Sequence, residues 1–312
     1  MQVAFLFPGQ GSQQIGMGKE LYENFFEAQE VYETVNYTLK QKLTNIIFHG
    51  DEEILKDTSN AQPAIMATSI AILKVLEYLA SKKIEDLCNV LAGHSLGEYS
   101  ALCATGTLML SDTAKILKIR GQAMEEAVAP GLGAMYALIG VNEAIATKIC
   151  KALSSDGVCE IANDNGAGQI ILSGTVEAFK KIDSLTKEFQ IKKAIKLPVD
   201  RPFHSSLMKK ATDIMSKEFL KYAFYKPKIK IIANYSADIY KSGEDVRNML
   251  IKQIEGKVRW GETIDKMYNE MGIRKFVEIG NGKVLSNLVK RQYPDVAVHS
   301  LQNIKDIENY LK

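Results

Sequence analysis

The sequence has few of the residues that build disulfides or metal sites. Among its 312 residues are four cysteines, four histidines, seven prolines and one tryptophan. The cysteines form no CxxC pair and fall in segments that we expect to be buried, which favours reduced thiols in a cytoplasmic protein. No two histidines are spaced i,i+4, so we expect no metal.

A strong charge of one sign and long apolar runs are missing as well. The net charge is +2, and no basic stripe interleaved with aromatic residues is visible, so we expect no nucleic-acid partner. No uninterrupted apolar run reaches the roughly 20 residues that span a bilayer. The chain starts with residues 3–7 (VAFLF), which are typical of a first strand and not of a signal peptide. We therefore expect no membrane partner.

What the sequence does have is the alternation of strands and helices that is typical of an α/β protein. Hydrophobic residues make up 46% of the chain, enough for a sizeable core. A helix is expected over 62–79, with Pro63 in its first turn. Residues 134–199 read as βαββαβ, the order of a ferredoxin-like unit. We predict an α/β-hydrolase-like body with a parallel sheet from residues 1–128 and 199–312, and an inserted ferredoxin-like subdomain over residues 129–198.

An expected apolar strand and an expected helix flank the short segment Gly93-His94-Ser95-Leu96-Gly97. This G-x-S-x-G context is that of a nucleophile elbow, which holds a serine at a helix N-terminus where an oxyanion is stabilised. The alternative is that small residues here only make a tight strand-to-helix crossing. Pro8-Gly9-Gln10-Gly11 follows the first strand, but Gln14 stands where a dinucleotide fingerprint needs glycine. A free backbone N–H near Gln10 could instead serve chemistry at the edge of the sheet.

Arg120 and His204 are the other informative residues. A helix over residues 111–128 places Arg120 inside its apolar sector, where a guanidinium needs a partner. That partner is either a carboxylate of the protein or one that arrives with the substrate. His204 precedes a helix expected over residues 207–222, a position that favours a neutral imidazole able to act as a base. A histidine beside a helix start can also be purely structural.

A series of motifs occurs in order along the chain. They are residues 7–13 (FPGQGSQ), 93–102 (GHSLGEYSAL), 120–124 (RGQAM), 133–135 (GAM), 203–205 (FHS) and 278–285 (EIGNGKVL). Together they closely resemble the malonyl-CoA:acyl carrier protein transacylases of bacterial fatty acid synthesis, which are serine acyltransferases. The resemblance covers nearly the whole chain, so it is far more specific than the elbow alone.

The resemblance implies a role for each matching residue. Ser95 would attack the malonyl thioester, and His204 would take up the serine proton and later return it to the departing thiolate. The backbone N–H groups of Gln10 and Leu96 would form the oxyanion hole. Arg120 would bind the free malonyl carboxylate, which supplies the partner that the guanidinium lacks.

The resemblance also implies the surroundings of these groups. Met124, Phe203 and Asn163 would line the substrate pocket, and Phe203 is the residue type of malonyl-selective relatives. A main-chain carbonyl near Arg259, in residues 258–260 (VRW), would orient His204, so no acidic third member is expected. The substrates would be malonyl-CoA and the phosphopantetheine thiol of acyl carrier protein, with no cofactor, and we expect a monomer.

Some features depart from the family pattern or leave alternatives open. Asp200 and Arg201 replace smaller residues; they could pair with each other or influence carrier docking, or Asp200 could perturb His204. Asn281 replaces a proline between two glycines. Five basic residues could dock an acidic carrier protein or could simply form a solvent-exposed charged face. They are Lys192, Lys193, Lys283, Lys290 and Arg291. The alternative functions are a polyketide-pathway acyltransferase, an esterase or thioesterase of α/β-hydrolase type, and a non-catalytic homologue that binds carrier protein.

Overall fold

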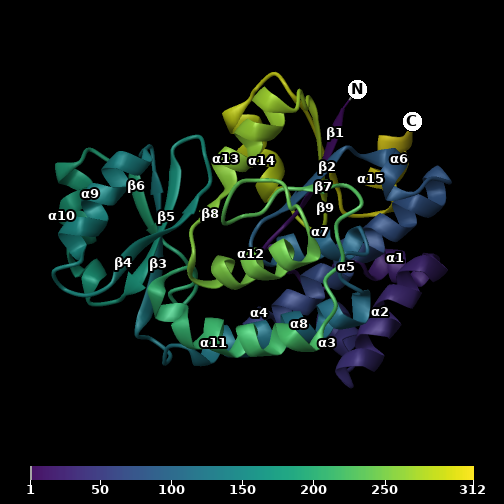
Figure 1. The fold of residues 1–312 in the computed structure, drawn as a ribbon, viewed down its shortest axis with the longest axis horizontal. Helices are drawn as coiled ribbons and strands as arrows, with labels where there is room; N and C mark the ends of the chain where they lie inside the picture. The colour runs from purple at the N-terminus through teal and green to yellow at the C-terminus, as the bar shows by residue number, and fades with distance from the viewer. Residues whose placement is uncertain (1) are drawn as a thin grey trace.

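The computed structural model describes residues 2–312 and contains two β-sheets with helices packed around them (Figure 1). In the first sheet all strand pairs are parallel, and the order is β10-β9-β1-β2-β7. Its strands are β1 (Val3–Phe7), β2 (Val90–Gly93), β7 (Lys230–Ile231), β9 (Lys275–Ile279) and β10 (Ala297–Leu301).

Strands β1 and β2 in the middle of the first sheet are buried on both faces, which explains why their residues are all apolar or glycine. Phe5 and Phe7 of β1 point into one hydrophobic cluster, and Ala4 and Leu6 point into another. The helices around this sheet are α1 (Lys19–Asn24), α2 (Phe26–Leu39), α3 (Leu43–His49), α4 (Glu52–Lys56), α5 (Thr58–Ala80), α6 (Ile84–Leu87), α7 (Leu96–Ala104), α8 (Leu110–Glu126), α11 (Lys209–Glu218), α12 (Gly243–Glu255), α13 (Trp260–Asp265), α14 (Val284–Gln292) and α15 (Ile304–Leu311).

The second sheet has the order β6-β3-β5-β4-β8. Its strands are β3 (Gly133–Ile139), β4 (Cys159–Asp164), β5 (Gln169–Thr175), β6 (Lys193–Lys196) and β8 (Val258–Arg259). The pairs among β3 to β6 are antiparallel, whereas β8 joins β4 in parallel. In Figure 1 this sheet lies at the left with α9 (Glu143–Leu153) and α10 (Ile182–Glu188) on its outer side.

The two faces of the second sheet have different partners. Leu138 and Leu172 pack in the cluster under α9 and α10, while Met135 and Ile171 join the large core of the body. The mixed α/β fold expected from the sequence is therefore confirmed. The predicted boundaries at residues 129 and 198 stay a prediction, and β8 adds a strand to the second sheet from beyond them.

Helix α5 starts earlier than its local sequence indicates. It begins at Thr58, so Pro63 lies in its second turn and not in its first. The Ser59 N–H, which has no partner within the helix, donates to the Glu125 carboxylate of α8. A contact from a distant element thus extends the helix.

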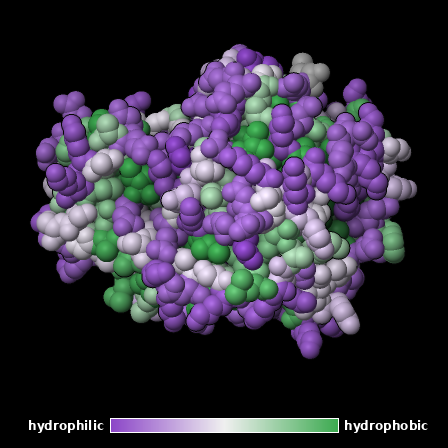
Figure 2. Space-filling view, in the orientation of Figure 1, coloured by the Kyte–Doolittle hydropathy of each residue, from purple (hydrophilic) through white to green (hydrophobic). Residues whose placement is uncertain are grey.

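By length and composition, α5 is also the one helix within residues 2–312 that could cross a membrane. Most of its apolar window is buried, and it packs against α2 and α8, as expected of a core helix. The face of the molecule seen in Figure 2 is largely hydrophilic, with apolar side chains in small scattered groups.

Candidate active site

Ser95 stands on a sharp turn between β2 and α7. Its backbone has φ 52° and ψ −109°, a conformation that costs energy for a residue with a side chain. A Cβ on Gly93 would lie 1.9 Å from the Gly97 carbonyl oxygen, and a Cβ on Gly97 would lie 2.1 Å from that of Phe7. Both glycines are therefore required for the crossing, and the half-buried serine hydroxyl is held at the first turn of α7.

His204 lies against this serine. Its Nε2 is 2.8 Å from Ser95 Oγ, and its Nδ1 is 2.8 Å from the carbonyl oxygen of Gln253. Because Nδ1–H donates to that carbonyl, Nε2 is free to accept the serine proton. Burial, and then the positive charge of Arg120, lower the pKa of His204 to about 3, so the imidazole is neutral at physiological pH.

The expected position of the carbonyl that orients His204 is wrong. Gln253 supplies it from the last turn of α12, where carbonyl groups lack intrahelical partners. Arg259, in the region predicted for this role, instead pairs with Glu262 and donates to the Ser236 carbonyl. Local sequence does not show which helix end reaches the imidazole.

Arg120 is 1% exposed and points at the serine. Its Nη1 donates to Gln62 Oε1 at 2.8 Å, and its Nη2 donates to Gln253 Oε1 at 2.9 Å and to Ser95 Oγ at 3.2 Å. Within residues 2–312 no carboxylate forms a salt bridge with it, which removes the structural ion pair as its explanation. The guanidinium is thus a buried positive charge beside a nucleophile and free to meet a carboxylate from outside.

The backbone donors expected at Gln10 and Leu96 both line the cavity that Ser95 faces. In the described part of the chain neither N–H donates to another group, whereas the Ser95 N–H is taken by Asn234 Oδ1 at 2.7 Å. These two N–H groups therefore suit a developing oxyanion better than that of the serine itself.

The cavity has a volume of about 680 Å³ and lies between the carboxyl edge of the first sheet and the inner face of the second. All three residues predicted for the substrate pocket, Met124, Phe203 and Asn163, line it. Met135 and Ile171 add apolar surface from β3 and β5. This volume fits a small acyl group with part of a longer arm.

The sequence did not reveal the side-chain amides that hydrogen-bond the Arg120 guanidinium and the Ser95 backbone. Gln62, Asn234 and Gln253 are each 1% exposed, and Glu98 is a buried carboxylate joined to the same network. The available signal was a polar residue in an otherwise apolar segment, such as Gln62 in α5 or Asn234 after β7. That signal marks burial, but it does not identify the partner.

The departures from the family pattern lie outside the reacting groups. Arg201 Nη1 is 2.6 Å from the Asp200 carboxylate, and its Nε donates to the Glu125 carbonyl, so the two charges do pair with each other. Asn281 Nδ2 donates to the Ser12 carbonyl at 2.7 Å and ties its turn to the loop that carries Gln10. Among the basic residues named as docking candidates, Lys290 donates to the carbonyl groups of Pro294 and Val296.

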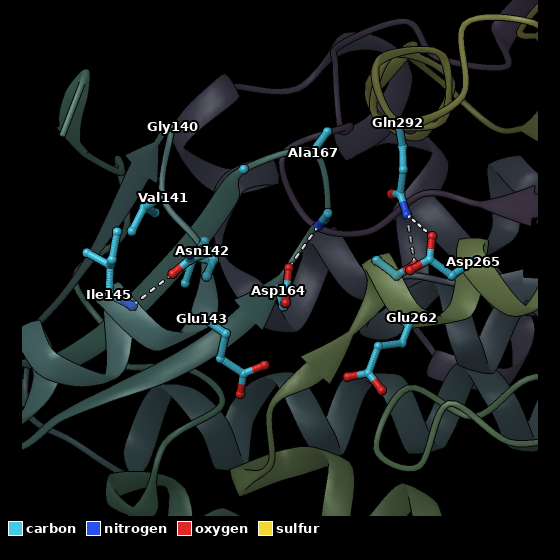
Figure 3. A pocket seen from close by; sticks show the side chains of 14 residues that line it. Gly140, Val141, Asn142, Glu143, Ile145, Asp164, Ala167, Glu262, Asp265 and Gln292 are labelled. Atoms are coloured by element: carbon cyan, nitrogen blue, oxygen red, sulfur yellow. Dashed lines mark hydrogen bonds between the residues drawn. The ribbon is translucent and has the colours of Figure 1, made fainter.

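A second cavity of about 510 Å³ lies between the tip of the second sheet and the start of α13 (Figure 3). Polar groups in its lining have structural partners: Asn142 caps α9, Asp164 accepts from the Gly166 N–H, and Gln292 of α14 donates to Asp265 of α13. None of the predicted site residues lines it. In residues 2–312 no group of His, Cys, Asp and Glu is arranged to hold a metal ion.

Comparisons with known proteins agree with this geometry. The profile of the acyl transferase domain family matches residues 4–308. The chain is 43% identical to the malonyl CoA-acyl carrier protein transacylase of Bacillus subtilis strain 168, covering 97% of this chain and 95% of that protein.

Solved structures give the same result. The crystal structure of acyl-carrier-protein-S-malonyltransferase from Bartonella henselae has a TM-score of 0.94 at 44% identity, covering 100% of this chain and 98% of the other. A malonyl-transacylase solved in complex with its type II PKS acyl-carrier protein has a TM-score of 0.94 at 33% identity, covering 100% and 99%.

Proposed function

The chain belongs to the acyl transferase domain family, and on that premise we propose that it transfers a malonyl group from malonyl-CoA to the phosphopantetheine thiol of acyl carrier protein. It is an enzyme, an acyl-carrier-protein S-malonyltransferase, like the relatives that it matches over nearly their full length. The observation that carries the assignment to this site is the buried Arg120 guanidinium, which hydrogen-bonds Ser95 Oγ and has no carboxylate partner among residues 2–312.

In the first half-reaction the Ser95 oxygen attacks the thioester carbonyl carbon of malonyl-CoA. The serine proton passes to His204 Nε2, whose Nδ1–H stays on the Gln253 carbonyl. The N–H groups of Gln10 and Leu96 stabilise the oxyanion. The C–S bond then breaks, and the CoA thiolate leaves with the proton from His204, so that the malonyl group remains as an ester on Ser95.

The second half-reaction runs the same steps in reverse order. His204 Nε2 accepts the proton of the phosphopantetheine thiol, and the sulfur attacks the ester carbonyl. The Ser95 oxygen leaves and regains its proton from His204. Arg120 holds the malonyl carboxylate through both steps, so that the carbonyl stays in place between serine and oxyanion donors. Water competes with the thiol, and the cavity limits its access.

The site itself does not distinguish a carrier protein of fatty acid synthesis from one of polyketide synthesis. A fatty acid carrier is supported by the resemblance of the motifs to transacylases of fatty acid synthesis, and a polyketide carrier by the solved complex with a type II PKS acyl-carrier protein. We propose fatty acid synthesis as the role of this enzyme. Transfer to a polyketide carrier at a rate equal to that for a fatty acid carrier would remove the basis for this choice.

Several finer features belong to the same proposal. The strand order β6-β3-β5-β4, with α9 and α10 on one face, supports a ferredoxin-like subdomain. The serine on a strand-to-helix turn of a parallel sheet supports an α/β-hydrolase-like body. We further propose a cytoplasmic protein that binds neither nucleic acid nor membrane, as the composition indicates, and that works as a monomer without a cofactor.

The test is intact-mass analysis of the wild type and of Ser95→Ala after incubation with malonyl-, acetyl- and methylmalonyl-CoA. The wild type should gain the mass of one malonyl group and lose it on addition of acyl carrier protein, whereas Ser95→Ala should gain none. Loss of the malonyl group to water as fast as to carrier protein would favour a thioesterase. A wild type that gains no mass would indicate a non-catalytic homologue.

A further inference from the structure

The positive charge of Arg120 has no counter-charge in contact with it in the described structure. The guanidinium is 1% exposed, and its hydrogen bonds go to the amide oxygens of Gln62 and Gln253 and to Ser95 Oγ. A buried cation without a compensating negative charge is strongly unfavourable. A carboxylate in direct contact would solve this problem, but it would also occupy the position that the substrate carboxylate needs.

Gln253 connects Arg120 to a carboxylate that lies one amide away. The Gln253 Oε1 accepts from Arg120 Nη2 at 2.9 Å, and the Nε2 of the same amide donates to Glu98 Oε2 at 2.7 Å. The second Nε2 hydrogen bond goes to the Ser95 carbonyl at 2.8 Å. All the hydrogen-bonding atoms of this amide are thus engaged, and its orientation is fixed.

Glu98 lies on α7 and is itself 1% exposed. Its Oε1 accepts from the Asn234 N–H at 3.1 Å and from the Tyr240 hydroxyl, so every contact to it is a donor. An ionised carboxylate, which only accepts, satisfies all of these donors. Burial raises the pKa of Glu98 to about 7, against the hydrogen bonds and the charge of Arg120.

We propose that Glu98 is a positioning residue that balances the charge of Arg120 through the Gln253 amide and leaves the guanidinium open to the carboxylate of the acyl donor. This inference rests on the proposed function, because it assumes that Arg120 binds that carboxylate. The negative charge of Glu98 then moderates the attraction of the site for a carboxyacyl group and has no direct effect on an uncharged acyl group.

The test replaces Glu98 with glutamine and measures formation of the acyl-enzyme at about pH 8, above the pKa of this carboxyl. The side-chain NH2 of a glutamine at position 98 would face another hydrogen-bond donor, either Gln253 Nε2 or the Asn234 N–H. We therefore expect slower acylation by both malonyl-CoA and acetyl-CoA. The ratio of kcat/KM for malonyl-CoA to that for acetyl-CoA should nevertheless rise by roughly tenfold, since the site loses a negative charge and the charge of Arg120 is no longer balanced. An unchanged or lower ratio would overturn the inference.

A matched control is Glu278→Gln. Glu278 is also a fully buried carboxylate, and it accepts from the Leu285 and Ser286 N–H groups at the start of α14, away from the cavity. This variant should lose stability without changing the ratio. If Glu98→Gln acylates too slowly to measure, malonate should raise its melting temperature more than that of the wild type, and an equal or smaller rise would overturn the inference.

Failure of this inference and failure of the proposed function give different results. If the wild type forms no malonyl-enzyme, the proposed function fails. If the wild type forms it and Arg120→Ala removes the preference for malonyl-CoA, but Glu98→Gln leaves the ratio unchanged, only the role of Glu98 fails.

Discussion

At the residue scale, the chemistry depends on two groups whose charges are set by burial. His204 is kept neutral by desolvation and by the nearby guanidinium, while Arg120 stays charged because arginine is not deprotonated in proteins. The same cation that attracts the substrate therefore helps to keep the base unprotonated. Ser95 hydrogen-bonds both residues and lies between them.

This arrangement predicts an unusual pH dependence. A free histidine has a pKa of about 6.5 and would lose its function as a base below that value. Because the pKa of His204 is lowered to about 3, the imidazole stays neutral as the pH falls, and its loss should begin only near that value. Because the pKa of Glu98 is itself raised to about 7, the profile is measured in Glu98→Gln, where acylation of Ser95 by malonyl-CoA, followed by rapid quench and mass analysis, should change little between about pH 8 and about pH 5. A tenfold fall across this range, centred near 6.5, would contradict the prediction.

The sequence was informative about residues that react and less so about residues that hold them. Ser95, His204 and Arg120 stand in local patterns that limit their chemistry, and the structure brings all three together. Gln253 could not be found in the same way, because its side chain contacts Ser95, Glu98 and Arg120, each more than 130 residues away in the sequence. Such contacts depend on the packing of α12 and have no local signature.

At the scale of elements, the turn between β2 and α7 and the last turn of α12 define the site. The first places the nucleophile and the second supplies the carbonyl for His204. Helix ends were predicted less well than helix positions, since the start of α5 depends on Glu125 from α8. The expected helix over residues 207–222 is likewise an α-helix only over Lys209–Glu218, with 3₁₀ turns at both ends.

The nucleophile turn predicts a large cost for a single methyl group. In Gly97→Ala the new Cβ would lie 2.1 Å from the Phe7 carbonyl oxygen, which is backbone of a central strand and cannot move away easily. Urea unfolding should show a loss of about 2–3 kcal/mol. Gly106→Ala, at a glycine with φ 69° and no atom within 4 Å, should cost only about 1 kcal/mol from backbone strain. Equal losses in the two variants would show that the close approach does not matter.

At the scale of the whole molecule, the cavity is closed by parts of both sheets. His94, beside the nucleophile, has its Nε2 2.9 Å from Asn165 Oδ1, which belongs to the turn after β4. The antiparallel arrangement within residues 134–199 could be predicted from strand order. The docking of this sheet onto the body, and the strand β8 that joins it, could not, because two-residue strands carry no pattern.

Loosening the contact between His94 and Asn165 should affect the exclusion of water from the cavity more than it affects folding. Asn165→Ala removes the shorter of two contacts to His94 Nε2 and leaves that of Asn163 Nδ2 at 3.2 Å; we expect the malonyl-enzyme to hydrolyse severalfold faster while its melting temperature changes little. Hydrolysis is followed by mass analysis after removal of excess malonyl-CoA. As a control, Lys257→Ala breaks the partly exposed ion pair with Glu143, which joins the same two parts of the molecule away from the cavity. Equal hydrolysis rates in Asn165→Ala and the wild type would contradict this role.

The central claim is that Arg120 determines which acyl group Ser95 carries. The most direct test compares kcat/KM for malonyl-CoA and for acetyl-CoA in the wild type, in Arg120→Ala, and in Arg259→Ala as a control arginine outside the site. Arg120→Ala should lose roughly 100- to 1,000-fold with malonyl-CoA and should retain or increase its rate with acetyl-CoA, while Arg259→Ala should keep the wild-type preference. An equal loss with both donors in Arg120→Ala would show that this arginine is structural and would contradict the account.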